Sequence, residues 1–199
     1  MSISDEDGKI LVKTARLVVT EYLKKGKKIE LSNEIKSKFA YKSGVFVTLD
    51  KKENLRGCIG FPMPDRILYQ SLLDAAIASS TEDPRFPPVK FEELDEITFE
   101  VTILTLPVEI KVDDTSEYPK MVKVGKDGLI MRWEFGSGLL LPQVPVEYGW
   151  NAEEFLNHTC EKAGAPSSYW KQKSAKILKF QGIVFKETKP NGQVKKLEL

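Results

Sequence analysis

The stretch ITFEVTIL, residues 97 to 104, alternates between apolar and polar side chains from Ile97 to Ile103. This period of two predicts a β-strand with one buried face and one polar face, which is typical of antiparallel sheets. The side chains expected to face a core are Ile97, Phe99, Val101 and Ile103. The side chains expected on the other face are Thr98, Glu100 and Thr102. An all-helical fold is therefore excluded.

The other predicted elements do not follow one another as regular β-α-β units. They are a helix over 5–24 capped by Ser4, a hairpin over 44–61, a helix over 66–80 capped by Asp65, strands at 129–133 and 139–141, a helix over 151–164 capped by Asn151, and a last strand over 175–187 interrupted at Gly182. This order predicts an α+β fold with a mainly antiparallel sheet flanked by helices.

The character of the sequence changes near Val112, where an acidic, turn-rich stretch begins, and strand character returns after Lys173. Residues 113–174 have their own hydrophobic set, but about 60 residues are marginal for an independent fold. We therefore expect a larger subdomain made of residues 1–112 and 175–199, which contains both termini, and a smaller subdomain made of residues 113–174.

Composition excludes several classes of protein. The chain has 30 basic and 29 acidic residues, whereas a general nucleic-acid binder usually carries a basic excess. No apolar run reaches the roughly 18 residues that span a membrane, and the acidic start is unlike a secretory signal, so we expect a cytoplasmic protein. The chain contains no CxxC, HExxH or GxxxxGK[ST] motif. We therefore predict neither a metal nor a cofactor.

Cys58 lies between two glycines in LRGCIG, residues 55–60. Glycine weakens a strand but allows close approach of another backbone or a ligand. Two interpretations stay open: a structural cysteine beside a bulge, or a reactive thiol. The single histidine, His158, is expected on the exposed side of its helix, and Cys160 in the core. A cysteine–histidine enzyme is therefore weakly supported.

Two other side chains are candidates for binding or chemistry. Glu100 is the one carboxylate on the polar face of the 97–104 strand, where it is either a solvated residue or a base. Arg85, in a loop with three prolines, either pairs with Asp83 or contacts a ligand.

The LRGCIG segment resembles the signature of the AMMECR family. Four further stretches are similar to that family: EDPRFPPV (82–89), ITFEVTIL (97–104), GLLLPQVPVEYGW (138–150) and FLNHTCEKAG (155–164). The resemblance implies two subdomains of unequal size, each with an antiparallel sheet flanked by helices. It also implies that LRGCIG faces a cleft between them. It implies no particular activity.

We therefore expect LRGCIG to form one wall of the cleft, which binds a large partner such as a protein or peptide segment. Nucleic acid is not an expected partner, and the oligomeric state is left open. The alternative is an enzyme that uses Cys58 as a reactive thiol, so whether the protein is an enzyme is also left open. The candidate catalytic residue is Cys58. The candidate binding residues are Leu55, Arg56, Gly57, Ile59, Gly60, Arg85 and Glu100.

Overall fold

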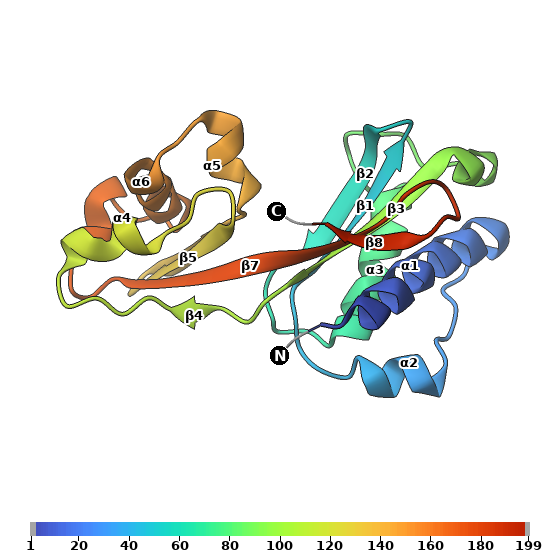
Figure 1. Cartoon of the computed structure of the whole chain (residues 1–199), viewed down its shortest axis with the longest axis horizontal. Coiled ribbons are helices and arrows are strands. Elements are labelled where there is room, and N and C mark those ends of the chain that lie inside the picture. The colour runs from blue at the N-terminus through green and yellow to red at the C-terminus, as the bar shows by residue number, and fades with distance from the viewer. Residues whose placement is uncertain (1–2, 198–199) are drawn as a thin grey trace. The chain divides into compact units, whose positions relative to one another are not determined.

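The structure, a computed structural model, describes residues 3–197. It combines helices with antiparallel strand pairs (Figure 1), so the predicted α+β class with a mainly antiparallel sheet is confirmed. No helix of the described part of the chain is both long and apolar enough to cross a membrane.

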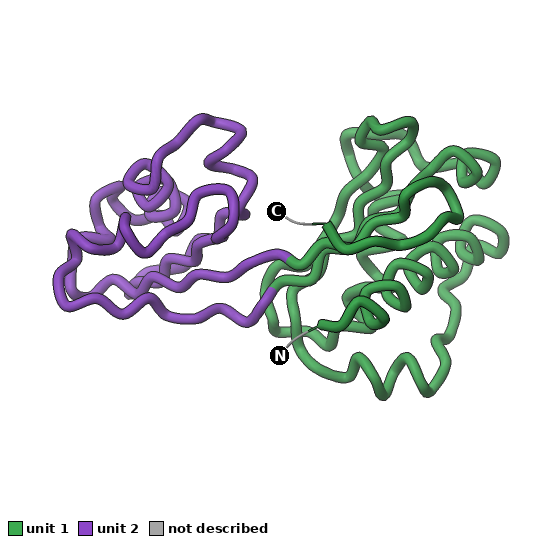
Figure 2. Tube along the Cα trace, in the orientation of Figure 1, with its two compact units in different colours: residues 1–104, 183–198 green, residues 105–182, 199 purple. Residues whose placement is uncertain are grey.

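The chain forms two compact units (Figure 2). Among the described residues, unit 1 contains 3–104 and 183–197, and unit 2 contains 105–182. The sequence placed the divisions at 112/113 and 174/175. The chain instead passes between the units at 104/105 and 182/183. The reason is that β4 (Val108–Glu109) pairs with the first half of β7 (Lys176–Glu187), and both belong to unit 2. That the units are separate subdomains stays a prediction.

Unit 1 has a sheet in which the strands follow the order β2-β1-β3-β7, with β8 pairing with β7. Its strands are β1 (Val45–Lys51), β2 (Asn54–Phe61), β3 (Ile97–Leu104), the second half of β7, and β8 (Val194–Leu197). Its helices are α1 (Asp5–Lys25), α2 (Asn33–Lys38), α3 (Leu68–Thr81) and the 3₁₀ helix η1 (Phe91–Glu96).

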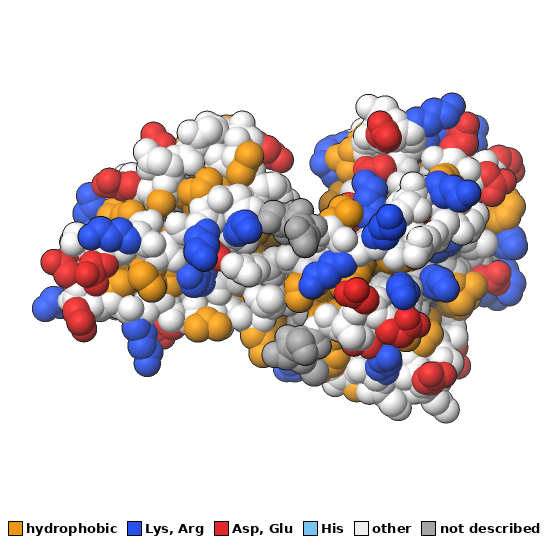
Figure 3. Space-filling view, viewed as in Figure 1, with side chains coloured by type: hydrophobic (Ala, Val, Ile, Leu, Met, Phe, Trp, Pro, Cys, Tyr) orange, Lys and Arg blue, Asp and Glu red, His pale blue; other side chains and the backbone are white. Residues whose placement is uncertain are grey.

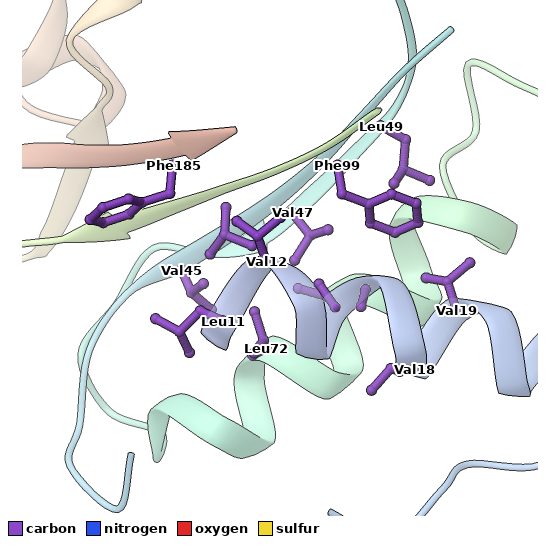
Figure 4. Close-up of a cluster of buried hydrophobic side chains, with 14 of the residues drawn as sticks. Leu11, Val12, Val18, Val19, Val45, Val47, Leu49, Leu72, Phe99 and Phe185 are labelled. Atoms are coloured by element: carbon purple, nitrogen blue, oxygen red, sulfur yellow. The ribbon is translucent and has the colours of Figure 1, made fainter. Parts of the chain in front are cut away.

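The core of unit 1 lies between the sheet and the helices α1 and α3. In Figure 4, Val45, Val47 and Leu49 of β1 point toward these two helices. The alternation predicted for β3 is confirmed, because its four apolar residues are buried and the polar ones between them are half-buried. The side chains of Thr98, Glu100 and Thr102 therefore lie on the opposite face of the sheet.

Helix α1 begins where the sequence places its cap, after Ser4. The Ser4 hydroxyl accepts a hydrogen bond from the Asp7 amide, and the Asp7 carboxylate accepts one from the Ser4 amide. Gly26 ends the helix with φ of 66°. A buried ion pair then ties α1 to β7, since Arg16 Nη2 lies 2.5 Å from Glu187 Oε2. This ion pair helps to hold α1 against the sheet.

The start of α3 differs from the prediction. The helix begins at Leu68 rather than Arg66, and Asp65 does not cap it. The Leu68 amide donates to the Tyr41 carbonyl, and the Ser43 amide donates to the Arg66 carbonyl. These long-range bonds hold Ile67 extended, so the helix begins at Leu68 and not at the position that Asp65 could cap.

Unit 2 contains a smaller antiparallel sheet in which β4 and β5 flank the first half of β7, and β6 pairs with β5. Its remaining elements are η2 (Thr115–Glu117), α4 (Tyr118–Met121), β5 (Asp127–Trp133), β6 (Gly136–Leu140), α5 (Gln143–Tyr148), α6 (Ala152–Lys162) and η3 (Ser167–Lys171). Asn151 caps α6 as predicted.

One expectation about β7 was wrong, because the strand runs through Gly182 without interruption. Next to the glycine, the Gln181 carbonyl accepts from the Thr105 amide, and the Gln181 amide donates to the Thr105 hydroxyl, both at 2.8 Å. These two hydrogen bonds keep the backbone extended where glycine alone would weaken it. β7 therefore supplies strand to both units.

Candidate functional site

The LRGCIG segment lies in β2, the edge strand of unit 1, and its glycines allow two close approaches. A Cβ atom on Gly57 would lie 2.0 Å from the backbone oxygen of Ser79 in α3. A Cβ atom on Gly60 would lie 2.3 Å from the ring of Phe46 in β1. Both distances are shorter than carbon–oxygen or carbon–carbon contacts allow. The two glycines are therefore required by packing within unit 1.

Arg56 is held by a network of structural contacts. Its Nη2 lies 3.0 Å from Glu93 Oε1, and its Nη1 donates to the Pro87 carbonyl at 2.9 Å. Arg56 lowers the pKa of Glu93 to about 2. β2 bulges at this point, because the pairing with β1 shifts register between Leu49 and Asp50. Arg56 therefore ties β2 to the loop that precedes η1.

The loop over residues 82–89 covers the edge of β2. The Cys58 amide donates to Asp83 Oδ2 at 2.8 Å, and Arg85 Nη2 donates to the Cys58 carbonyl at 3.2 Å. Asp83 and Arg85 also form an ion pair at 2.7 Å. This guanidinium holds the pKa of Asp83 well below its usual range. The two side chains thus satisfy the backbone groups that an edge strand leaves open, and they discourage pairing with another chain.

The Cys58 side chain lies on the face of the sheet opposite the helices. Its sulfur lies 3.1 Å from the Thr48 hydroxyl of β1, the residue directly opposite it. Burial raises the pKa of the Cys58 thiol, although the Thr48 hydrogen bond and the Arg85 charge oppose this shift. The thiol is therefore protonated at neutral pH, which is unlike an activated nucleophile.

Glu100 of β3 is the next residue across the sheet after Cys58 of β2 and Thr48 of β1. It lies directly opposite Thr48 on the other side of β1. Its side chain is only 19% exposed. Burial raises the pKa of Glu100, the Lys186 charge lowers it, and the nearby Asp50 raises it further. Cys58, Thr48 and Glu100, one from each of three neighbouring strands, form what we call the polar row.

Two further side chains border the polar row. Lys186 of β7 lies 2.5 Å from Asp50 Oδ2 and 3.6 Å from Glu100 Oε2. Asp50 is two residues after Thr48 in β1 and is buried. Both residues were missed by the sequence analysis. The alternation of VFVTLDK in β1 places Thr48 and Asp50 on the polar face, but the neighbouring strands cannot be read from it.

The structure divides the predicted site residues into two groups. Cys58 and Glu100 lie in the polar row, and Arg85 reaches this region only through the Cys58 carbonyl. The other predicted residues contact the rest of unit 1 or solvent. Arg56, Gly57 and Gly60 make the contacts given above, Ile59 lies opposite Val47 on the core side, and Leu55 is 41% exposed.

The remaining candidates lie in unit 2 and play local roles. His158 Nδ1 lies 2.7 Å from Glu161 Oε2, and its ring stacks on Trp150 at 3.8 Å. Cys160 is fully buried, and burial raises its pKa to about 11. The expected surface histidine and core cysteine are therefore found. Among residues 3–197, no three His, Cys, Asp or Glu side chains are grouped closely enough to hold a metal ion.

Comparison with known proteins identifies the family. The family model described as AMMECR1 matches residues 12–185. The chain belongs to the AMMECR1 family. Similar AMMECR1 relatives include a protein of Methanothermobacter thermautotrophicus, which is 47% identical over 185 residues, 93% of this chain and 96% of the relative. A protein of Pyrococcus abyssi is 48% identical over 202 residues, 99% of this chain and 98% of the relative.

A solved AMMECR1-like structure agrees with the fold. The crystal structure of an uncharacterized protein from Pyrococcus horikoshii matches with a TM-score of 0.81 and 48% sequence identity. The match covers 99% of each chain. The predicted family is therefore confirmed, and the activity of this family member must be inferred from its geometry.

Proposed function

We propose that this protein is a binding protein that takes a protein or peptide segment on the polar face of the unit 1 sheet. The observation that carries the proposal is the polar row of Cys58, Thr48 and Glu100. Most of the LRGCIG segment and the 82–89 loop have structural partners within unit 1. The polar row is what remains: a thiol, a hydroxyl and a half-buried carboxylate side by side on one sheet face.

The chemistry of the polar row favours binding over catalysis by Cys58. The atom beside the sulfur is a hydroxyl oxygen, not a base, and the thiol pKa is raised rather than lowered. A nucleophilic cysteine needs the opposite, a thiolate stabilised by a neighbouring cation or base. The donors and acceptors of the polar row can instead hydrogen-bond to the polar groups of a bound protein or peptide segment.

The charge around the polar row favours a protein segment over nucleic acid. Arg56 and Arg85, the cations of the LRGCIG segment and the 82–89 loop, are both paired with carboxylates. They are therefore not available to neutralise phosphates. Figure 3 shows basic and acidic side chains mixed over the face in view, without a continuous basic area on either unit.

The proposal can be tested by selecting binders from a displayed library of random peptides with the full chain as bait. Thr48→Arg places a long cation in the middle of the polar row. We expect this substitution to lower the affinity of the selected peptides by about tenfold or more, as for other central interface positions. Ser137→Arg, at an exposed position of β6 in unit 2, is the matched control and should leave the affinity of the peptides unchanged.

Two outcomes would contradict the proposal. One is a library from which no peptide is enriched over a bait of unrelated sequence. The other is a set of peptides that bind Thr48→Arg as well as they bind the unsubstituted chain. Cys58→Ser keeps a group that can hydrogen-bond to Thr48, so peptide binding should stay within about twofold. A larger loss would favour a specific role for the thiol.

A further inference from the structure

The carboxylates beside the polar row outnumber the cations that face them. Asp50 and Glu100 share one ammonium group, that of Lys186. Asp83 and Arg85, which also influence Cys58, compensate each other in an ion pair. The group of Asp50, Glu100 and Lys186 therefore keeps one negative charge when all three are ionised.

The geometry places this excess charge on Glu100. The Lys186 ammonium lies 2.5 Å from Asp50 and 3.6 Å from Glu100, and the longer distance is outside the range of a normal hydrogen bond. Among residues 3–197, Lys186 is the one cation paired with Glu100, and it lies closer to Asp50. With four fifths of its side chain buried, Glu100 therefore has only a shared and more distant ion-pair partner. Its raised pKa agrees with this picture.

We infer that the bound segment presents a cationic group, an ammonium or a guanidinium, to Glu100. This inference rests on the proposed binding function and specifies the chemistry of the partner. A lysine or arginine side chain would complete the unbalanced pair and form a charge-assisted hydrogen bond in a partly desolvated place. Thr48 lies directly opposite Glu100 in the sheet, and its hydroxyl oxygen can accept a second hydrogen bond from a cation that reaches both residues.

Other ligand chemistries fit the polar row less well. A carboxylate or phosphate would face the uncompensated charge of Glu100 and would be repelled. A neutral amide could donate to Glu100 but would leave the charge unbalanced in a half-buried position. Only a cation both donates hydrogen bonds and cancels the charge.

A pair of small probes of the same shape tests the inference directly. Ethylguanidinium chloride and the neutral N-ethylurea are titrated separately into the ¹⁵N-labelled full chain, at constant ionic strength and well below denaturing concentrations. We expect saturable shifts of the Thr48, Cys58 and Glu100 amides with ethylguanidinium. N-ethylurea should not shift them saturably.

Two variants provide the comparison. Glu100→Gln keeps the shape and removes the charge, so it should weaken the ethylguanidinium response by about tenfold, as expected for loss of a charged hydrogen bond. Glu134→Gln, at an exposed position in the turn between β5 and β6, should leave the response unchanged. Equal responses to the two probes, no saturable response to ethylguanidinium, or an undiminished response in Glu100→Gln would each overturn the inference.

Failure of this inference is distinguishable from failure of the proposed function. If the displayed library yields peptides that need Thr48 but contain no required lysine or arginine, the binding function stands and the cationic partner is wrong. If selected peptides lose binding when their basic residue is replaced by norleucine or citrulline, both are supported. If no peptide is enriched, the binding function itself falls.

Discussion

The Cys58 amide donates a hydrogen bond of 2.8 Å to Asp83, a residue 25 positions further along the chain. Arg85 in turn donates a hydrogen bond to the Cys58 carbonyl. Both backbone groups of Cys58 on the outer side of β2 are therefore hydrogen-bonded to the loop. An edge strand normally exposes these groups to other chains. The 82–89 loop therefore protects the edge of the sheet against pairing with another chain.

Replacing Asp83 with asparagine should destabilise the protein by about 1–3 kcal/mol, because the charged acceptor is buried and has several donors. The pKa of Asp83 is lowered in the folded state, so its stabilisation is fully present above the unfolded pKa. That stabilisation is lost as the pH falls below about 4, toward the folded pKa. Urea denaturation at pH 7 and at lower pH should show the difference between the two proteins shrinking in acid.

Asp95→Asn is the control for this measurement, since Asp95 is an exposed carboxylate in η1. Its cost should stay within about 0.5 kcal/mol at every pH. An Asp83→Asn protein as stable as the unsubstituted chain at pH 7 would show that the loop does not hold the β2 edge.

Gly57→Ala should cost about 2–4 kcal/mol, since the added Cβ meets a backbone oxygen of α3 and the helix must move away from the sheet. Gly26→Ala is a useful comparison. Gly26 has a positive φ but nothing within 4 Å of the added Cβ, so its cost should be about 1 kcal/mol. Denaturant midpoints of the two variants measure the difference. Equal costs would mean that α3 does not pack tightly against β2.

Local patterns were sufficient to predict the strand β3 and the position of Glu100 on it. The alternation of residues 97–103 has a period of two, and the observed burial follows it residue by residue. The caps at Ser4 and Asn151 were also readable, since a capping box depends on residues three positions apart. These features involve neighbours in sequence.

The features that the sequence could not supply depend on contacts between distant residues. The cap expected at Asp65 is absent because hydrogen bonds with Tyr41 and Ser43 keep Ile67 extended, so that the helix begins at Leu68. The pairing of Lys186 with Asp50 joins residues 136 positions apart. It follows from the strand order β1-β3-β7, which no local pattern specifies.

The contacts of the LRGCIG segment also depend on residues that are distant in the sequence. The sequence singled out LRGCIG as a unit, but alternation could not show that Gly57 faces a helix backbone while Cys58 faces Thr48. The bulge near Asp50 also changes which side chains share a face. Arg56, the residue at the bulge, contacts Glu93 and the Pro87 carbonyl.

Cys58 should react slowly with iodoacetamide at pH 7, and faster as the pH rises toward and above 9. The folded pKa of its thiol is raised, so less thiolate is present at a given pH than in the unfolded chain. We expect a rate at pH 7 that is at least about tenfold below the rate in urea. Peptide mapping by mass spectrometry separates Cys58 from Cys160, which is fully buried and should react later.

The Cys58→Ser chain, in which Cys160 is the single thiol, gives the background rate for this experiment. Native Cys58 that reacts faster than the urea-unfolded thiol at pH 7 would contradict the protonated state described above. That result would favour the alternative of an enzyme with an activated cysteine.

Glu100→Gln should make the protein more stable at neutral pH, by about 0.5–1 kcal/mol. Burial raises the folded pKa of Glu100, so the folded state binds its proton more tightly than the unfolded state does. Stability is therefore lost as the pH rises from the unfolded pKa through the folded pKa, and glutamine removes this loss. Thermal unfolding from pH 4 to pH 8 should show a gain that grows with pH and then levels off. Glu134→Gln, the exposed control, should show no such trend. A destabilised Glu100→Gln protein would mean that the pairing with Lys186 outweighs the cost of burial, and that Glu100 is a structural residue of the sheet rather than a carboxylate kept for a partner.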